Sequence, residues 1–457
     1  MKKEKRETTA AVRQRRAIAA VCVGMILFSA ASWCLTIVGH RQSLETLEEQ
    51  KAAAEALFQK QIYDEALSEY KACLELDPED ASCMKRVAEI YHLTGQENSC
   101  LAWCERTLRK TPGAPEICYL EAQAYDSQKK IASAIAALKK ADKTAGDTTE
   151  IDRYLLELKG RYDLTYFTFQ AISPWFLLPD GTPCATVAES TSLSIYSAEG
   201  KEQVSGPFTY LGASSDEELL FPVRAENSWF YVDESGERRL VPDKEYSYLG
   251  SFSEGLACAR RDDMAGFLDH DLKEMRFEFQ ETCPMKSGYA LAKKDGTWFV
   301  LDSSLQEVTA CTFTEIKKDV YGNAQKCGMI LGKLPGEEAA WAMFAPDGSQ
   351  TIEFTAEDFR LPEEKRSPVA FLKGGKWGFV DPDGTVLLQP AYEDAFSFSK
   401  GLAAVKLDGK WGYIDKKGNV IIPFSFDGAG PFSSKGTAFV QNHAGYSLLT
   451  LSRYAES

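Results

Sequence analysis

The sequence predicts a multidomain α plus β protein with a single transmembrane helix, a solenoid of three helix pairs and an all-β repeat domain. Three observations lead to this fold class. A basic tail precedes an uncharged apolar stretch, a second segment repeats small residues every 34 positions, and the long C-terminal part repeats a short aromatic β pattern. The 457 residues are enough for two or three domains of ordinary size.

The composition excludes several classes of function. The chain has 52 Lys and Arg against 67 Asp and Glu, a net charge of −15, whereas nucleic-acid binding requires clustered positive charge. We therefore expect no nucleic acid as the main partner. Four histidines, His40, His92, His270 and His443, are too few for a His-rich metal site.

The N-terminal segment has the pattern of a membrane anchor. Residues 1–16 hold seven basic and two acidic side chains, a net charge of +5, and residues 17–38 are uncharged. These 22 residues would form a helix of roughly 33 Å, against a hydrocarbon core of about 30 Å. Because basic residues stay on the cytoplasmic side, we expect a single-pass cell-membrane protein with a cytoplasmic tail at 1–16 and its bulk outside.

Two other interpretations of this segment remain open. A cleaved signal peptide would use Ser29 and Ala31 as the small residues before the cut, although apolar residues continue beyond them. A buried globular helix is the third interpretation, which the preceding basic block disfavours. Lipoprotein processing at Cys34 is disfavoured, because Trp33 occupies a position that requires a small residue.

The next segment repeats with a period of 34 residues. Small residues at two fixed places would let paired helices approach closely, and Pro would end the second helix of each pair. Four positions keep this register: Ala54, Ala88 and Ala122; Ala66, Cys100 and Ala134; Leu57, Tyr91 and Tyr125; Pro78, Pro112 and Gly146. This pattern resembles the tetratricopeptide repeat over residues 47–146. We expect a helical domain at 45–164, closed by a capping helix at 151–164.

The resemblance implies a concave face that binds an extended peptide or a partner helix. The candidate groove residues are the exposed positions of the first helices: Lys51, Glu55, Phe58, Lys85, Glu89, His92, Tyr119, Gln123 and Asp126. A solvated face that only spaces two domains is the alternative. The family's clamp for a C-terminal carboxylate uses Lys and Asn on these helices. No Asn occurs at 48–60, 81–93 or 115–127, so a chaperone-tail ligand is not expected.

A second repeat fills residues 165–457. The run 375–381, Gly-Lys-Trp-Gly-Phe-Val-Asp, recurs at 409–415 as Gly-Lys-Trp-Gly-Tyr-Ile-Asp. This resembles the WG repeat family, with Trp377, Gly378, Trp411 and Gly412 as the structural signature. Eight units are predicted, with opening strands near Cys184, Glu218, Gly255, Gly288, Gly328, Ser367, Gly401 and Gly436.

Each WG unit is predicted to be a three-stranded meander. Asp408-Gly409 suits a two-residue hairpin turn, and Lys417-Gly418 suits a second turn. Such meanders must stack to bury their faces, either as a closed propeller or as an open solenoid. The β-rich segment 166–178 belongs to no complete unit, while the last unit ends after two strands. We favour the propeller, sealed by its own N-terminal strand, because closure removes exposed edges.

The sequence contains no recognisable catalytic constellation. No phosphate loop, Gly-x-Ser-x-Gly or HExxH motif is present, so we expect neither an enzyme, nor a cofactor, nor a metal site. The run 381–384, Asp-Pro-Asp-Gly, fits a β-turn better than a calcium loop. Cys100 and Cys104 lack the spacing of a zinc site. The ten cysteines beyond the predicted membrane segment show no disulfide framework, and we expect most to be buried free thiols.

Two functions follow from this organisation. The first is a membrane-anchored scaffold of the bacterial cell envelope that binds a protein or peptide. The second is a carbohydrate or wall-polymer sensor with its ligand on the β domain. Exposed aromatic side chains on the β domain would favour the second.

Overall fold

The computed structural model describes residues 46–144, 147–167, 176–179, 182–188, 191–197, 200–214, 219–319, 322–336, 340–443 and 445–454. The chain forms two compact units, Met1–Leu158 and Lys159–Ser457. The predicted tail at 1–16 and the predicted transmembrane helix at 17–38 lie outside the described residues. Among the helices that are described, none is both long and apolar enough to cross a membrane.

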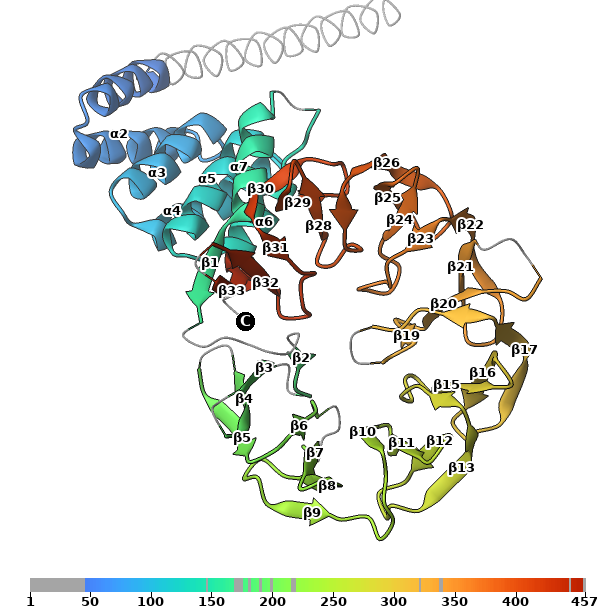
Figure 1. Ribbon diagram of the computed structural model, residues 1–457. Helices are drawn as coiled ribbons and strands as arrows, with labels where there is room; N and C mark the ends of the chain where they lie inside the picture. Colours follow the sequence, from blue (N-terminus) through green and yellow to red (C-terminus); the bar gives the residue numbers. More distant parts are fainter. Residues whose placement is uncertain are drawn as a thin grey trace, which may run out of the picture. The chain divides into compact units, whose positions relative to one another are not determined.

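The first unit consists of antiparallel helix pairs (Figure 1). Residues 46–59 are helical and pair with α2 (Tyr63–Leu76). The following helices are α3 (Ala81–Leu93), α4 (Glu97–Lys110), α5 (Pro115–Ser127), α6 (Ile131–Lys139) and α7 (Thr149–Gly160). The predicted three helix pairs are therefore present, in the predicted order.

The small residues of the 34-residue period lie where helices approach each other. All six, Ala54, Ala66, Ala88, Cys100, Ala122 and Ala134, are fully buried. Larger side chains pack around them in three successive clusters, one for each helix pair. The structure thus gives the physical reason for the period, because a larger side chain at these positions would push the helices apart.

The turns within the helix pairs also repeat. Gln61, Gly95 and Lys129, spaced 34 residues apart, all adopt the left-handed conformation, with φ of 60°, 72° and 62°. The next backbone N–H in each repeat bonds back to a carbonyl five residues earlier, as in the 2.7 Å bond from Gln96 to Tyr91. This Schellman-type ending closes the first helix of each pair and directs the chain into the second.

The capping helix is shorter than the sequence analysis predicts. It ends at Gly160 rather than Leu164, and strand β1 (Tyr162–Tyr166) follows directly. The boundary expected at 164/165 accordingly lies between Leu158 and Lys159. The apolar spacing of Tyr162, Leu164 and Tyr166 has the period of two that a strand requires, and Gly160 ends the helical pattern before it.

The second unit is an eight-bladed β-propeller, as favoured over the open solenoid (Figure 1). Each blade is a sheet of four antiparallel strands, with one additional strand in blade 5. Blades 1 to 4 comprise β2 (Phe176–Leu177), β3 (Pro183–Ala188), β4 (Leu193–Ser197) and β5 (Glu202–Gly206); β6 (Tyr210–Leu211), β7 (Phe221–Ala225), β8 (Ser228–Val232) and β9 (Arg238–Leu240); β10 (Tyr248–Ser253), β11 (Leu256–Arg261), β12 (Met264–Leu268) and β13 (Glu274–Phe279); β14 (Glu281–Thr282), β15 (Tyr289–Lys294), β16 (Thr297–Asp302) and β17 (Glu307–Phe313).

The remaining blades follow the same order around the ring. Blades 5 to 8 comprise β18 (Glu315–Ile316), β19 (Gln325–Lys326), β20 (Met329–Lys333), β21 (Trp341–Phe344) and β22 (Gln350–Ala356); β23 (Asp358–Phe359), β24 (Val369–Lys373), β25 (Lys376–Val380) and β26 (Val386–Tyr392); β27 (Asp394–Ala395), β28 (Leu402–Leu407), β29 (Lys410–Asp415) and β30 (Val420–Phe426); β31 (Gly428–Ala429), β32 (Thr437–Asn442), β33 (Gly445–Leu451) and β1. A short 3-10 helix, Ser452–Tyr454, ends the described chain.

The eight predicted units correspond to the eight blades. Their predicted opening strands are β3, β7, β11, β15, β20, β24, β28 and β32, the second strand of each blade. The predicted three-stranded meander lacks one strand, however. A two-residue inner strand such as β27 lies in the segment that the sequence analysis assigns to the connecting loop, and two residues are too few to show a period.

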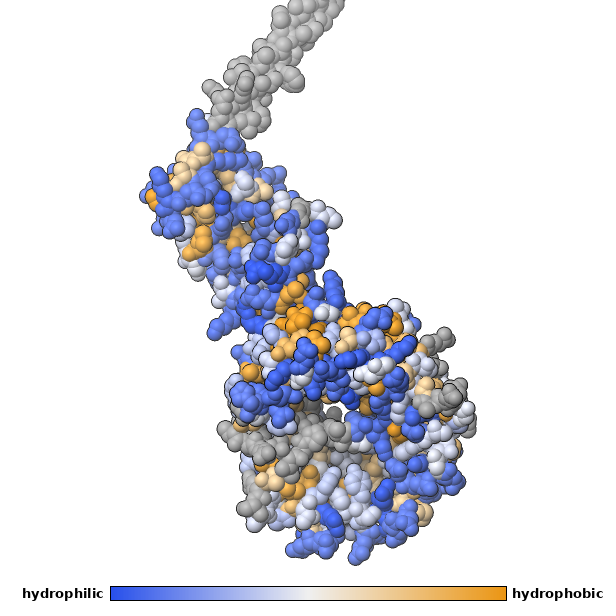
Figure 2. Space-filling model, turned by 45° about the horizontal axis from the view of Figure 1, so that its top comes forward, coloured by the Kyte–Doolittle hydropathy of each residue, from blue (hydrophilic) through white to orange (hydrophobic). Residues whose placement is uncertain are grey.

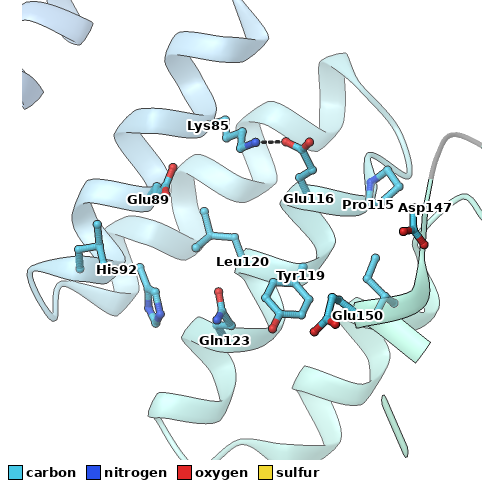
Figure 3. A pocket seen from close by; sticks show the side chains of 12 residues that line it. Lys85, Glu89, His92, Pro115, Glu116, Tyr119, Leu120, Gln123, Asp147 and Glu150 are labelled. Atoms are coloured by element: carbon cyan, nitrogen blue, oxygen red, sulfur yellow. Dashed lines mark hydrogen bonds and ion pairs between the residues drawn. The ribbon is translucent and has the colours of Figure 1, made fainter. Parts of the chain in front are cut away.

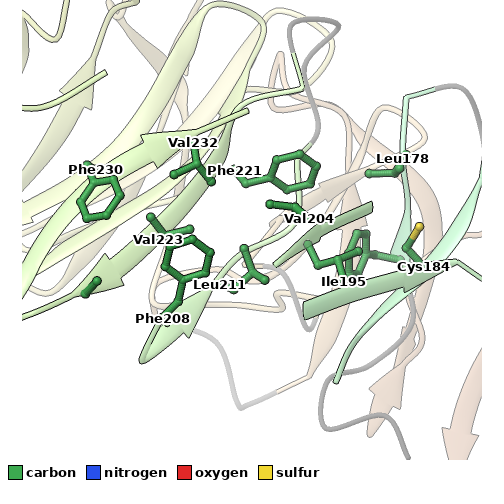
Figure 4. Close-up of a cluster of buried hydrophobic side chains, with 12 residues drawn as sticks. Leu178, Cys184, Ile195, Val204, Phe208, Leu211, Phe221, Val223, Phe230 and Val232 are labelled. Atoms are coloured by element: carbon green, nitrogen blue, oxygen red, sulfur yellow. The ribbon is translucent and has the colours of Figure 1, made fainter. Parts of the chain in front are cut away.

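The hydrophobic core lies between blades rather than within them. Figure 4 shows one cluster, in which Ile195 and Val204 of blade 1 meet Phe221 and Val223 of blade 2. Equivalent clusters join each following pair of blades as far as blades 6 and 7. Each sheet buries both faces only when its neighbours are present, which is why these units occur as an array.

A tyrosine side chain on the third strand of a blade contacts the inner strand of the next blade or the residues just after it. The ring of Tyr413 packs 4.8 Å from that of Phe432, and its hydroxyl donates to the carbonyl of Gly430 at 3.0 Å. Tyr231 makes the same pair of contacts with Phe252 and the carbonyl of Gly250. This repeated contact fixes the spacing between blades.

The Trp-Gly signature is structural, as predicted. A Cβ atom on Gly412 would lie 2.8 Å from the carbonyl oxygen of Ile422, and one on Gly378 would lie 2.7 Å from that of Leu388. Both glycines therefore allow the outer strand of the same blade to approach closely. Trp377 packs in the cluster shared by blades 6 and 7, with the Arg360 guanidinium 4.7 Å from its ring centre.

The ring is closed by the N-terminal strand of the propeller. β1 pairs with β33 along its whole length, from Tyr162 opposite Leu451 to Tyr166 opposite Ser447. Blade 8 is thus built from both ends of the unit. The sequence analysis predicts this kind of closure but assigns it to residues 166–178; the structure places it at 162–166, and residues 176–177 form the inner strand of blade 1 instead.

Candidate functional site

The helical unit contains a cavity of about 560 Å³ between the first helices of the second and third repeats and the start of α7 (Figure 3). Its lining residues are Lys85, Glu89, His92, Leu93, Pro115, Glu116, Tyr119, Leu120, Gln123, Asp147, Glu150 and Ile151. A volume of this size is typical of sites that hold a small ligand or a few side chains of a partner. We call this cavity the groove.

Local sequence features position the walls of the groove. Pro115 occupies the first turn of α5, where its missing N–H costs nothing, and so fixes the start of this helix. Asp147 accepts hydrogen bonds from the side chain and backbone N–H of Thr149, at 2.6 and 2.9 Å, and these bonds lower the pKa of Asp147. The same carboxylate therefore accepts from the first backbone N–H of α7 and lines the groove.

The groove carries more negative than positive charge. Four carboxylates line it, from Glu89, Glu116, Asp147 and Glu150, against Lys85 and His92. Lys85 forms an ion pair with Glu116 across two helices, drawn in Figure 3, and His92 Nδ1 lies 2.9 Å from the carboxylate of Glu97. Glu89 also pairs with Arg86 at 2.8 Å, and Glu150 pairs with Arg153 at 2.6 Å. A positively charged partner side chain would thus share carboxylates that already have a basic neighbour.

The groove also offers apolar contact surface. Tyr119 lies between Gln123 and Glu150 in Figure 3, and Leu93 at the rim is 50% exposed. Figure 2 shows a mainly hydrophilic surface over the helical unit, with small separate hydrophobic patches. An exposed leucine beside a tyrosine and a buried leucine, Leu120, is therefore a localised feature of this unit.

Five of the nine predicted groove residues line the cavity: Lys85, Glu89, His92, Tyr119 and Gln123. The other four are engaged in contacts between helices. Lys51 pairs with Asp80, Glu55 accepts from Tyr70 at 2.6 Å and pairs with Arg86 at 2.9 Å, Phe58 lies under the Arg86 guanidinium, and Asp126 accepts from Tyr154 at 2.6 Å.

The residues that complete the groove are not among the predicted ones. Pro115 and Glu116 precede the exposed positions predicted on the third repeat, and Asp147, Glu150 and Ile151 belong to the capping segment. A signal was present for the capping residues, because a helix that follows the last repeat continues the stack and contributes to the same concave face.

Other predicted features have structural roles. Asp381 and Gly384 form the turn between β25 and β26, with a 2.9 Å backbone bond, as the β-turn interpretation predicts. In the part of the chain that the structure describes, no group of side chains has the arrangement of a metal site. Cys100 and Cys104 are fully buried with sulfur atoms 3.9 Å apart, and hydrogen bonding between them together with burial raises the pKa of Cys104 well above its usual value.

The nine cysteines whose side chains the structure describes are free thiols. Eight of them are buried, and Cys327 is half-buried. Burial raises the pKa of the Cys83 and Cys258 thiols to about 12, and the carboxylate of Asp80 adds to the effect at Cys83. These thiols therefore stay protonated and unreactive near neutral pH.

Family models match both repeat types. A tetratricopeptide repeat model matches residues 115–148, and a WG containing repeat model matches residues 229–264, 377–411 and 411–446. The chain therefore carries a tetratricopeptide repeat followed by WG repeats. The match at 229–264 adds a repeat to the two that the Trp-Gly signature marks plainly. No curated protein matches the chain at a significant level.

Several solved structures are similar to parts of the chain. The TPR2B domain of yeast Sti1 in complex with pHsp70 is 23% identical and covers 24% of this chain and 94% of its own, with a TM-score of 0.24. The Yersinia enterocolitica type III secretion chaperone SycD, in complex with a peptide of the translocator YopD, is 18% identical and covers 25% of this chain and 87% of its own, with a TM-score of 0.23. A catalytically inactive virginiamycin B lyase from Staphylococcus aureus with quinupristin is 12% identical and covers 64% of this chain and 99% of its own, with a TM-score of 0.33.

Proposed function

Because the chain carries a tetratricopeptide repeat ahead of WG repeats, we propose that it is a non-catalytic scaffold that binds a protein segment in the groove. The groove is the observation that supports this proposal most directly, since it combines apolar and charged side chains on a concave helical surface. We further propose that the N-terminal segment anchors the scaffold in the cell membrane, with its bulk outside the cytoplasm.

The charges of the groove define the partner. Four carboxylates against one lysine and one histidine favour a segment that carries Arg or Lys, and Tyr119 with Leu120 favours an apolar side chain beside it. An acidic C-terminal tail would compete with Glu89 and Glu150 for Arg86 and Arg153, with which these carboxylates pair. The lack of the Asn residues that a carboxylate clamp requires points the same way.

Peptide binding to the purified full chain tests this function. We expect labelled peptides of about eight residues that combine Arg and Leu to bind, and the same peptides with Glu in place of Arg to bind at least about tenfold more weakly. Fluorescence polarisation measures both sets. Stronger binding of the acidic set would contradict the proposal.

A substitution within the groove locates the site. Gln123 lines the groove and is half-buried, so Gln123→Arg would add bulk and positive charge there. We expect it to weaken binding of the basic peptides by about tenfold, because it repels their charge. Gln59→Arg is the matched control, since Gln59 is exposed and lies outside the groove. Equal binding by the two variants would place the site elsewhere.

Protease treatment of intact cells tests the proposed location. The basic tail at 1–16 supports a cytoplasmic N-terminus, so external protease should digest the repeat domains and leave an N-terminal tag intact. A cytosolic protein that survives the treatment controls for lysis. If the repeat domains are digested only after lysis, the orientation is the reverse.

A further inference from the structure

The first residue of the inner strand is of two chemical kinds in blades 2 to 7. The first residue of the inner strand is acidic in four consecutive blades: Glu281, Glu315, Asp358 and Asp394 in blades 4 to 7. At the same position, blades 2 and 3 have Tyr210 and Tyr248. The register confirms the equivalence, because each of these residues lies opposite the same position of the second strand, Arg224, Arg260, Lys293, Lys333, Leu372 and Lys406 in turn.

The acidic positions are used for contacts between blades. Glu281 pairs with Lys318 of the next blade at 2.9 Å, Asp394 pairs with Arg360 of the preceding blade at 2.7 Å, and Asp358 pairs with Lys317 of the preceding blade. Glu315 pairs with Lys333 of its own blade at 3.0 Å. These carboxylates are therefore neutralised within the ring.

The tyrosine positions border a cavity instead. It has a volume of about 430 Å³ and is lined by Phe176, Tyr210, Ala213, Ser214, Tyr248, Gly250, Ser251, Cys258, Thr282, Pro284, Lys286, Lys318, Gly322 and Asn323. These residues come from the inner parts of blades 1 to 5 (Figure 1). Tyr210 and Tyr248 are 38% and 40% exposed. Both rings pack against Trp229, with ring centres 5.0 and 5.6 Å from that of the tryptophan.

The polar side chains of this cavity carry hydroxyl, amide and ammonium groups. Lys286 has no carboxylate partner among the described residues, and no described lining residue is acidic. Ser214 is 1% exposed, and within the described chain its hydroxyl has no hydrogen-bond partner. Burial raises the pKa of both Tyr210 and Tyr248, so both hydroxyl groups remain neutral near pH 7.

We propose that this cavity binds an anionic saccharide, with Lys286 at the carboxylate or phosphate and the tyrosines and small hydroxyl side chains at the sugar. A sugar presents many hydroxyl groups and an apolar ring face, and hydroxyl, amide and aromatic side chains match these features. Within the described residues the Lys286 ammonium group has no carboxylate partner, and such a group in a partly enclosed site favours a ligand of opposite charge. The site is independent of the groove, so either proposal can fail alone.

Calorimetric titration of the purified full chain tests this site with glucuronic acid, glucose phosphate and glucose. We expect at least one of the two anions to bind saturably, and glucose to bind at least about tenfold more weakly than that anion. The tighter of the two anions identifies the charged group. If none of the three binds saturably, or if glucose binds as tightly as both anions, the proposal is overturned.

Substitutions assign the binding to the cavity. Lys286→Met should weaken anion binding by about tenfold, because it removes the charged donor, and leave glucose binding unchanged. Lys373→Met is the matched control at the exposed last residue of β24 in blade 6, and it should change neither affinity. Tyr248→Phe, which keeps the ring against Trp229, should weaken both anion and sugar binding. Unchanged anion binding by both cavity variants overturns the proposal, and thermal melting checks that each variant is folded.

Discussion

Asp80 shows how one side chain can hold two helices in place. Its carboxylate accepts from the backbone N–H of Cys83 at 2.9 Å, which caps α3, and it pairs with Lys51 of the first helix, at residues 46–59. Although burial acts in the opposite direction, these contacts and a bond from Ser82 lower the pKa of Asp80 to about 2. The carboxylate is therefore charged wherever the folded helical unit is stable.

The lowered pKa of Asp80 predicts a pH dependence of stability. A depressed pKa stabilises the folded state above the unfolded value of about 3.9, and this contribution disappears as the pH falls toward 2. We expect Asp80→Asn to lower the free energy of unfolding by about 2 kcal/mol at pH 7 and to have little effect at pH 2. Denaturant unfolding of the two proteins at several pH values measures the difference.

Asp64→Asn provides the control for this measurement. Asp64 lies in the first turn of α2 and is exposed. Its replacement should change stability by less than about 0.5 kcal/mol across the same pH range. A cost of Asp80→Asn that is the same at pH 2 and pH 7 would show that the ion pair with Lys51 contributes nothing.

At the scale of single elements, the helix-pair turn is a repeated device with one glycine among three residues. Gly95 has a φ of 72°, and a Cβ atom placed on it would have no neighbour within 4 Å. Gly95→Ala therefore adds backbone strain without a clash, and it should lower the free energy of unfolding by about 1 kcal/mol. Thermal or denaturant unfolding measures this cost.

Lys129 offers the matched substitution one repeat later. It already holds the left-handed conformation as a non-glycine residue, with a φ of 62°. Lys129→Ala should thus be nearly neutral, within about 0.5 kcal/mol. Equal costs for the two alanine substitutions would mean that the strain at this turn is not the reason for the glycine.

Much of the element order could be predicted from the sequence, because it depends on periodic signals. The small-residue period located the helix pairs, and the strand that opens each predicted unit located the second strand of every blade. The inner strands were missed because two residues cannot show a period of two. The end of α7 was misplaced because Leu164 suits either an amphipathic helix or a strand, and only the pairing opposite Leu449 decides between them.

The groove could be predicted only in part, for a different reason. Exposed positions of the first helices are defined by spacing, which selected Tyr119 and Gln123, two residues that line the groove. Spacing does not show whether a side chain is free or held by another helix. Glu55 and Asp126 are held by Tyr70 and Tyr154, contacts between residues 15 and 28 positions apart that only the three-dimensional structure reveals.

For the whole molecule, the pairing of β1 with β33 determines whether the propeller is a closed ring. Phe167 donates its N–H to the carbonyl of Tyr446, and the N–H of Ser452 donates to the carbonyl of Arg161. Because bonded and non-bonded pairs alternate in an antiparallel ladder, the N–H of Thr165 also faces β33, whereas that of Tyr166 faces away.

This alternation gives a matched pair of proline substitutions. Thr165→Pro removes a hydrogen-bond donor of the ladder and should open blade 8. We expect it to lower the free energy of unfolding by at least about 2 kcal/mol more than Tyr166→Pro does. Both side chains are exposed, so neither change removes a buried contact. Hydrogen exchange should show lost protection in β33 and β32 for Thr165→Pro alone. Loss confined to blade 1, or equal loss for both variants, would contradict closure through β1.

Closure through both ends of the propeller also sets a schedule for its synthesis. Strand β1 ends at Tyr166, and its partner β33 ends at Leu451, so the ribosome adds 285 residues between the ends of the two strands. At about 5–20 residues per second, roughly 15 to 60 s pass before β33 is available. Throughout this interval β1 has no partner strand, and the face of blade 1 that will meet blade 8 stays uncovered. The helical repeats can already fold, because their contacts are local. We therefore expect chaperones to protect the propeller chiefly during its synthesis, while β1 is unpaired.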